Sequence, residues 1–472
     1  MRIYLKSIDL DLAIVVALLN PKIMHTLFPE LLFIAIKIVT MPVDTAIEKE
    51  EILVIGGGAA GMIAAWRAAT LGANVILLEK NAKLGIKLLI SGGGKCNITH
   101  GGEMETLRQQ FKVNEGRFLK HAFFEFTNAE IIRFLNELGV ETYERDDGRI
   151  FPKSGKAGDV VHALRRLMEG AGVEIRLSAA VEEILKDDDG VSGVRTSQEI
   201  LPSRHIILAT GGSSYPRTGT TGDGFGWARK LGHSIVPLRP ALAPILLSPT
   251  PPKEWQGVAL RNCILKASTE EAVVAQWQGD LLFTHEGISG PAVLEISRET
   301  FESMEGGQKV FIQVDISSQL AESELEKNIQ QEIVANGSRN VETLAALFLP
   351  HRLAPFLLNA CRIDGTKKCH QMTKDERRTL VQTLKNWPIG CAKEIQIERG
   401  EVTSGGVELK EIDPKTMHSR VVKGLYVCGE VLDISGPVGG YNLQAAFSTG
   451  YVAGEAAALN LKNSPSSSPS SS

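Results

Sequence analysis

The sequence predicts an α/β protein whose main domain is interrupted by an insertion. A strand, a helix and a second strand follow one another over residues 51–79, and such a unit of about 30 residues builds a parallel sheet. The pattern stops near residue 237, where six prolines fall between Pro237 and Pro252. It resumes near residue 405. An insertion into one domain explains this order.

The elements before the interruption are predicted from apolar spacing and from glycine stops. Glu51–Ile55 is a short apolar run typical of a buried strand, and an alanine-rich helix over Met62–Leu71 ends at Gly72. Asn74–Glu79 is the next predicted strand. Further helices are predicted over 128–138 and 158–170, and further strands over 172–177, 181–185, 191–196 and 204–209.

The insertion and the return to the main domain are predicted in the same way. Strands are expected over 258–268, 272–278 and 309–316. Residues 322–387 have a helical pattern with breaks at 336–337 and 364–365. Strands are then expected over 394–398, 407–409 and 424–429, followed by an alanine-rich helix over 442–460.

Composition and charge exclude several classes of protein. Apolar residues make up 43% and charged residues 22% of 472 residues, which excludes a disordered or fibrous chain. The formal net charge is −4 and no run of five Lys or Arg occurs, so no nucleic-acid partner is expected. Six scattered cysteines without a CxxC pair indicate free thiols and a cytoplasmic location.

The two ends of the chain differ from the rest. Residues 1–46 hold two apolar runs, Asp11–Leu19 and Leu31–Val39, both too short for the ~20 residues of a membrane span. Two interpretations remain open for this segment, an export signal or a translation start that belongs at Met41. We expect it to be poorly ordered. Residues 463–472 form a Ser/Pro tail with nothing to bury, so disorder is predicted there too.

A glycine-rich turn joins the first predicted strand to the first helix. Gly56, Gly58 and Gly61 have the GxGxxG spacing, which lets backbone N–H groups at a helix N-terminus approach a pyrophosphate. Glu79 ends the second strand, where a carboxylate accepts hydrogen bonds from ribose hydroxyls. Together these features predict a Rossmann-like dinucleotide-binding domain.

Three further glycine-containing segments are candidates for contact with the same ligand. Ser91–Asn97 (SGGGKCN) lets backbone approach a flat ligand, and Lys87 and Lys95 flank it with positive charge. Thr210-Gly211-Gly212 follows a predicted strand. Gly429-Glu430 also follows a strand, and Gly439-Gly440 opens the last helix. Asp433 lies between them, where it would meet the ribityl-pyrophosphate part if the ligand is a flavin dinucleotide.

These segments together make the sequence similar to the BaiN/RdsA-type NAD(P)/FAD-dependent oxidoreductases, bacterial flavoproteins that include bile-acid 3-dehydro-Δ4,6-reductases and aminoacetone-oxidase-like members. The resemblance rests on IGGGAAGMIAA, KLLISGGGKCNIT, FPKSGKA, ILATGGSSYPRTGTTGDG, FTHEGISGPAVLEIS and GEVLDISGPVGGYNLQAAFSTG, and runs from about residue 47 to 461. It implies FAD as cofactor. It also implies a glutathione-reductase-type FAD-binding domain interrupted by a β-barrel-like insert that itself carries a helical insert.

The expected domain boundaries follow from the resemblance and the composition shifts. The FAD-binding domain covers 47–238 and 406–462, the barrel-like insert 239–320 and 389–405, and the helical insert 321–388. The residues expected to bind the cofactor are Gly56, Gly58, Ala59, Ala60, Gly61, Glu79, Lys80, Lys87, Ser91, Gly92, Gly93, Gly94, Asn97, Val181, Thr210, Gly211, Gly212, Gly429, Glu430, Asp433, Gly439, Gly440, Tyr441, Asn442, Leu443 and Gln444.

Catalytic residues are less well defined by the pattern. His285 is a candidate to orient or protonate a substrate, although His285 and Glu286 on one strand would point to opposite faces. Cys96 is a candidate thiol without a partner thiol at redox spacing, so a packing or flavin-facing role is favoured. Tyr215 and Arg217 lie in a turn, either solvated or meeting an anionic substrate. No metal-ligand spacing is present.

The functional hypothesis is hydride transfer through non-covalently bound FAD to or from a small organic substrate. A second GxGxxG after a suitable strand is lacking, so NAD(P)H is expected only as a transient reductant. Three alternatives fit the same motifs: an oxygen-using oxidase of a small amine or ketone, a flavin-dependent RNA-modifying enzyme, and a flavin sensor. No stable membrane insertion is expected, and the sequence does not define an oligomeric state.

Overall fold

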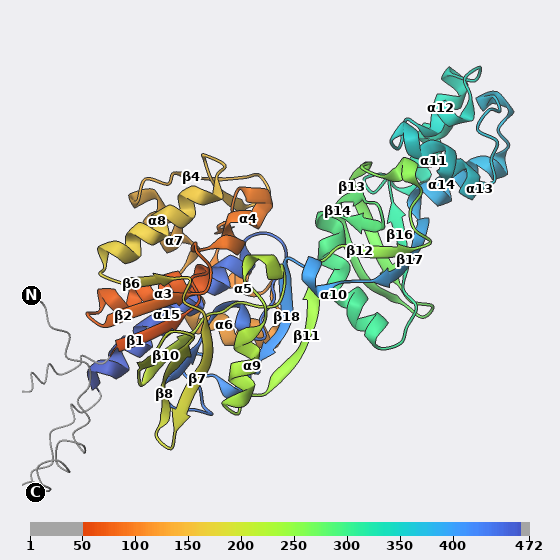
Figure 1. Cartoon of the computed structure of the whole chain (residues 1–472). Helices are drawn as coiled ribbons and strands as arrows, with labels where there is room; N and C mark the ends of the chain where they lie inside the picture. Colours follow the sequence, from red (N-terminus) through yellow and green to blue (C-terminus); the bar gives the residue numbers. More distant parts are fainter. Residues whose placement is uncertain (1–50, 464–472) are drawn as a thin grey trace, which may run out of the picture. The chain divides into compact units, whose positions relative to one another are not determined.

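A computed structural model describes residues 51–463, and the predictions for 1–46 and for the Ser/Pro tail lie outside this range. Its centre is a five-stranded sheet in the order β19-β10-β1-β2-β6, in which every neighbouring pair is parallel (Figure 1). The strands are β1 (Glu51–Ile55), β2 (Asn74–Glu79), β6 (Glu174–Leu177), β10 (His205–Leu208) and β19 (Leu425–Val427). Strand β19, from the end of the chain, pairs with β10, so the predicted Rossmann-like domain with an interruption is confirmed.

Two helices of small residues pack closely beside this sheet. These are α3 (Ala59–Thr70) and the last helix α15 (Tyr441–Asn463). A Cβ atom at Gly450 would lie 2.3 Å from the Ala60 carbonyl oxygen, and one at Gly454 would lie 2.2 Å from that of Ala64. The two helices therefore approach to backbone contact, which fixes the start of α15 near the glycine-rich turn before α3.

The remaining elements of this domain surround the sheet. Two three-stranded sheets lie outside it, in the orders β3-β5-β4 and β7-β8-β9. Their strands are β3 (Thr99–His100), β4 (Thr142–Glu144), β5 (Arg149–Pro152), β7 (Val181–Asp187), β8 (Gly190–Thr196) and β9 (Ile200–Pro202). The helices are α4 (Ile86–Gly94), α5 (Met104–Arg108), α6 (Val113–Glu125), α7 (Asn128–Glu137), α8 (Ala157–Gly170) and α9 (Asp223–Lys230).

The insertion contains a closed six-stranded barrel, which confirms the barrel-like insert. The antiparallel pair β11 (Ile235–Ala241) and β18 (Val402–Val407) leads into it and out of it (Figure 1). The barrel strands are β12 (Ile245–Ser248), β13 (Ala259–Ser268), β14 (Val273–Phe283), β15 (Gly287–Ser289), β16 (Phe311–Asp315) and β17 (Trp387–Glu394). Helix α10 (Pro291–Glu305) packs against the barrel. The hydrophobic core of the barrel is separate from that of the sheet domain.

The helical part lies between β16 and β17 and shares the core of the barrel. It consists of α11 (Glu322–Ala335), α12 (Val341–Ala345), α13 (Ala354–Cys361) and α14 (Lys374–Lys385). The strand predicted over 394–398 is wrong, because β17 ends at Glu394 and a 3₁₀ turn covers Ile397–Arg399. Local apolar character does not separate a strand from such a turn.

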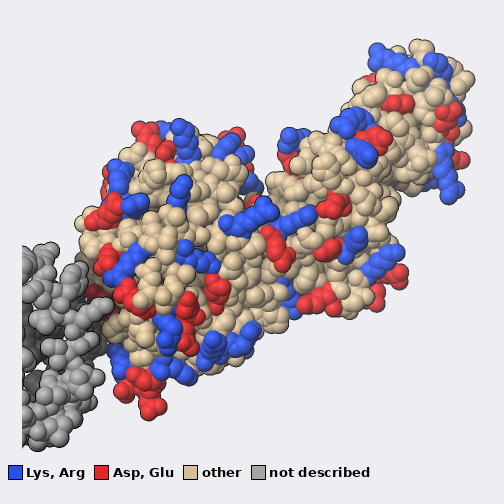
Figure 2. Space-filling view, viewed as in Figure 1, with Lys and Arg blue, Asp and Glu red and all other residues tan. Residues whose placement is uncertain are grey.

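Within residues 51–463, none of the helices is both long enough and apolar enough to cross a bilayer. On the face drawn in Figure 2, Lys and Arg are interspersed with Asp and Glu.

Candidate cofactor and active site

A cavity of about 640 Å³ opens at the carboxyl ends of the central strands. Gly56 follows β1, Glu79 ends β2, Thr210 comes just after β10 and Gly429 just after β19, and all four line the cavity. Ligands of open parallel sheets bind at this edge. One wall of the cavity comes from the insertion, through residues such as Leu282 and Leu294. The cavity therefore joins the sheet domain to the inserted barrel.

The glycine-rich turn before α3 forms a cradle without side chains. Gly58 is the N-cap of α3, no side chain caps that end, and a Cβ at Gly58 would meet no atom within 4 Å. The first N–H groups of α3 are thus open toward the cavity, as an anionic group requires. Gly61 has a packing role instead. A Cβ there would lie 1.9 Å from the Gly56 carbonyl oxygen, so only glycine allows this close contact within the turn.

The Glu79 side chain, at the end of β2, is held by hydrogen bonds from the glycine-rich turn and from the residues that follow β2. Its Oε2 accepts a hydrogen bond from the Gly57 N–H at 2.7 Å, and its Oε1 accepts from the Asn81 N–H at 2.8 Å. The side chain is buried yet borders the cavity. This placement agrees with a carboxylate that accepts hydrogen bonds from a ribose.

Replacing Glu79 with alanine is expected to weaken FAD binding about 10- to 100-fold, since hydrogen bonds to a charged group contribute about 1.5–3 kcal/mol. Flavin content after gel filtration and an FAD titration would measure the loss. Glu137→Ala, on the exposed face of α7, is the matched control. Wild-type flavin retention in Glu79→Ala would overturn the ribose assignment.

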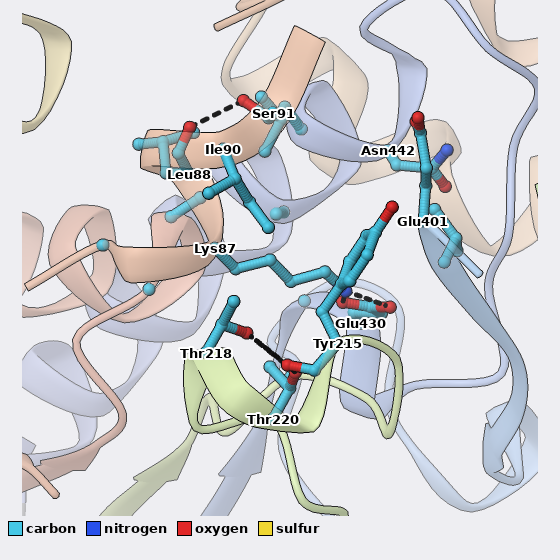
Figure 3. Close-up of a pocket in the computed structure, with 18 of the residues that line it drawn as sticks. Lys87, Leu88, Ile90, Ser91, Tyr215, Thr218, Thr220, Glu401, Glu430 and Asn442 are labelled. Atoms are coloured by element: carbon cyan, nitrogen blue, oxygen red, sulfur yellow. Dashed lines mark hydrogen bonds and ion pairs between the residues drawn. The ribbon is translucent and has the colours of Figure 1, made fainter. Parts of the chain in front are cut away.

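Lys87 and Glu430 form an ion pair inside the cavity (Figure 3). The Lys87 Nζ lies 2.7 Å from Glu430 Oε2 and donates to the Ser214 Oγ at 2.8 Å. Glu430 Oε1 also accepts from the Thr403 N–H at 2.9 Å. The pair therefore joins four segments distant in the sequence, and the charge of Lys87 is already balanced by a carboxylate.

Two further features fit a large polar cofactor. Thr210 and Gly211, in the turn after β10, both line the cavity. In the predicted glycine loop, which continues α4 with a break at Ser91, Gly93 lines the cavity with φ +67° and no atom within 4 Å of a Cβ. The cradle, the acid and the open loop together fit a dinucleotide cofactor.

Most of the predicted cofactor residues line this cavity. They are Gly56, Gly58, Ala59, Ala60, Glu79, Lys80, Lys87, Ser91, Gly92, Gly93, Asn97, Val181, Thr210, Gly211, Gly429, Glu430, Gly439, Gly440, Asn442 and Leu443. The predicted residues outside the lining are Gly61, Gly94, Gly212, Asp433, Tyr441 and Gln444.

The three non-glycine residues outside the lining have structural partners instead. The Asp433 Oδ1 accepts from the Gly405 N–H at 3.0 Å, so this acid holds strand β18. Gln444 is fully buried and bonded to Thr99, and Tyr441 stacks on His100. Near the start of α15, these side chains support the backbone that faces the cavity.

Neither catalytic candidate from the sequence reaches the cavity. Cys96 is fully buried, and burial raises the pKa of its thiol to about 12, which suits the packing role. His285 and Glu286 lie in the turn between β14 and β15, so the expectation that they share a strand is wrong. Across residues 51–463 no group of three His, Cys, Asp or Glu side chains has the arrangement of a metal site.

Several lining residues are not among the predicted site residues. Arg145 and Arg149 come from the hairpin of β4 and β5, and Leu282, Leu294 and Glu401 come from the insertion. Leu294 lies within the FTHEGISGPAVLEIS segment, but its place in the cavity, like that of the others, is visible only in the folded chain. Phe151, which also lines the cavity, begins the FPKSGKA segment noted above.

A parallel sheet with an open glycine cradle, an acid at the end of β2 and a second entry at α15 defines a Rossmann-type FAD-dependent oxidoreductase. The chain belongs to the HI0933-like protein family, whose Rossmann-domain model matches residues 50–456. It is 30% identical to the 3-dehydro-bile acid delta(4,6)-reductase of Clostridium scindens, over 86% of this chain and 98% of that protein.

Two further relatives bear a different name. The chain is 31% identical to the ribosomal RNA dihydrouridine synthase of Escherichia coli, over 86% of this chain and 97% of that protein. It is also 31% identical to the protein of that name from Haemophilus influenzae, over 85% of this chain and 96% of the relative. These relatives leave a nucleic-acid substrate open, contrary to the expectation from net charge.

Proposed function

We propose that this flavoprotein is a reductase that adds two hydrogens across a carbon–carbon double bond conjugated to a carbonyl group. The observation that carries the proposal is a single cavity that runs from the cofactor cradle to the wall supplied by the insertion. The names of the relatives point to one shared chemistry. A 3-dehydro-delta(4,6) bile acid and a uracil base both hold a double bond conjugated to a carbonyl.

The cofactor in this proposal is FAD, held by the cradle before α3, by Glu79 and by the entry to α15. When bound, FAD supplies the hydride equivalent. NAD(P)H is proposed as a transient reductant.

Side chains of the cavity wall orient the substrate. The Arg149 side chain lines the cavity, and its charge is balanced only loosely, since its Nε lies 3.6 Å from Asp147 Oδ2. A guanidinium placed this way donates hydrogen bonds to a substrate carbonyl oxygen and stabilises the charge that develops there. Leu282, Pro291 and Leu294 provide an apolar wall that excludes water.

The test is an anaerobic experiment on the FAD-loaded protein. The flavin is reduced with NADH or NADPH, and then a 3-oxo-Δ4 steroid acid or ribosomal RNA lacking dihydrouridine is added. The proposal predicts recovery of oxidised-flavin absorbance with one acceptor and a product two hydrogens heavier by mass spectrometry. Reoxidation by neither acceptor, with peroxide formed from an amine donor, would contradict the proposal and favour an oxidase.

The choice of acceptor decides the substrate class. Both signs of charge are interspersed on the face shown in Figure 2, which suits a small acid or a substrate held by few phosphate contacts. Turnover of the steroid acid alone would place the substrate among small molecules. Turnover of the RNA alone would place it among nucleic acids.

A further inference from the structure

Tyr215 is held in an unusual backbone conformation at the edge of the cavity. Its φ is +52°, in the left-handed region that non-glycine residues seldom adopt. The Tyr215 N–H donates to the Glu398 carbonyl at 3.2 Å, and its own carbonyl accepts from the Thr218 Oγ1 at 2.8 Å. The surrounding loop therefore fixes a strained residue, which is a feature found at functional sites.

The phenol ring of Tyr215 crosses the cavity with its hydroxyl free for a ligand. Figure 3 shows the ring pointing away from Thr218 and toward Asn442 and Glu401. Among residues 51–463, no hydrogen bond joins another protein group to this hydroxyl. Because a cavity-facing hydroxyl can both donate and accept, Tyr215 is placed to act on a bound substrate.

The charges around this hydroxyl favour its protonated form. Burial raises the pKa of Tyr215, and the Glu401 carboxylate raises it further. The Lys87 cation in the same cavity is paired with Glu430, so its charge is already balanced. Tyr215 therefore keeps its proton through neutral pH, as an acid must before it reacts.

We propose that Tyr215 is the acid that protonates the substrate carbon next to the carbonyl, and that Glu401, toward which the ring points, is a positioning residue for the phenol. The inference rests on the proposed function. A hydride, which bound and reduced FAD would supply, adds to the far carbon of the double bond, and the π electrons move toward the carbonyl. The Tyr215 O–H bond then breaks as the new C–H bond forms, and solvent returns a proton to the phenolate.

The first test compares Tyr215→Phe with the wild-type protein in separate half-reactions. Flavin content and the rate of flavin reduction are expected to stay within twofold. Reoxidation by the acceptor is expected to slow by about 100-fold or more, the usual contribution of a general acid. Tyr451→Phe is the matched control, because Tyr451 lies on α15, packed against Phe126, and does not line the cavity. Unchanged reoxidation, or loss of FAD, in Tyr215→Phe would overturn the proposal.

The second test needs no acceptor and no turnover. The ultraviolet absorbance of tyrosinate is titrated in the oxidised wild-type protein, and Tyr215 is assigned by difference from Tyr215→Phe. Glu401→Gln is expected to lower the pKa of Tyr215 while leaving it above the usual value, since burial is the larger cause. An unchanged titration would overturn the role of Glu401. If neither acceptor reoxidised the flavin of the wild-type protein, the proposed function would be contradicted. The titration would still show whether Glu401 acts on Tyr215.

Discussion

Gly58→Ala is expected to abolish FAD retention while leaving the protein folded. The new Cβ would meet no protein atom within 4 Å, and the φ of −83° suits alanine, so the fold has no reason to change. The methyl group would, however, stand in the cradle at the N-terminus of α3, where a pyrophosphate needs direct access to N–H groups. We expect FAD affinity to fall by at least about 100-fold, comparable to losing hydrogen bonds to a charged group.

Gly61→Ala provides the contrast that separates binding from folding. Its Cβ would lie 1.9 Å from the Gly56 carbonyl oxygen, so the turn itself must shift and the thermal midpoint must fall. Flavin content and the thermal midpoint of the apoprotein measure the two effects. A Gly58→Ala protein that binds FAD normally would show that the cofactor does not use this turn.

Breaking the ion pair between Arg298 and Glu115 is expected to destabilise the fold strongly. Arg298 on α10 lies 3.0 Å from Glu115 on α6, and the Glu115 side chain is only 2% exposed. Arg298 also donates to the Ser435 carbonyl at 3.1 Å, so it connects α10 with the sheet domain. Arg298→Met would leave Glu115 buried without its partner, at a cost of about 3–5 kcal/mol.

The pH dependence of this loss has a defined sign. Burial already raises the pKa of Glu115, and loss of Arg298, which lowers it, would raise it further. When folding raises the pKa of a carboxyl group, the group costs no stability below its unfolded-state pKa, where it is protonated in both states. The fold loses stability as the pH rises through the folded-state pKa, because the buried carboxyl then has to ionise. The deficit of Arg298→Met should therefore grow from pH 5 to pH 8.

Thermal midpoints at the two pH values test this prediction. Glu115→Gln combined with Arg298→Met should recover part of the stability and remove the pH dependence. Arg133→Met, at an exposed pair with Glu137, is the control and should change stability by less than about 0.5 kcal/mol. A pH-independent change of that small size in Arg298→Met would refute the argument.

The sequence predicted the parts of the site that depend on local pattern. Gly56, Gly58 and Glu79 lie within one strand–helix–strand unit, so their spacing alone placed them at one sheet edge. The pairing of β19 with β10 was predictable because the α/β pattern resumes after the insertion. Gly61, in the same motif, was predicted to bind the cofactor, but it serves the close contact with Gly56.

Other parts of the site depend on contacts between distant segments. Lys87 and Glu430 are 343 residues apart, and nothing near either residue indicates that the other neutralises it. An acid near the end of a strand, such as Asp433, predicts a cofactor contact, but Asp433 bonds to Gly405 and is not among the cavity-lining residues. Tyr215, Arg149 and Glu401 reach the cavity from three separate segments, so their convergence is visible only in the folded chain.

We infer that the cavity at the carboxyl ends of the sheet holds FAD for redox chemistry. The most direct measurement is the visible absorbance spectrum of the purified protein, taken before and after adding FAD and then, without oxygen, after adding NADH or NADPH. We expect flavin absorbance that stays with the protein through gel filtration and bleaches with at least one of the two nucleotides. A colourless protein that retains no added FAD would contradict it.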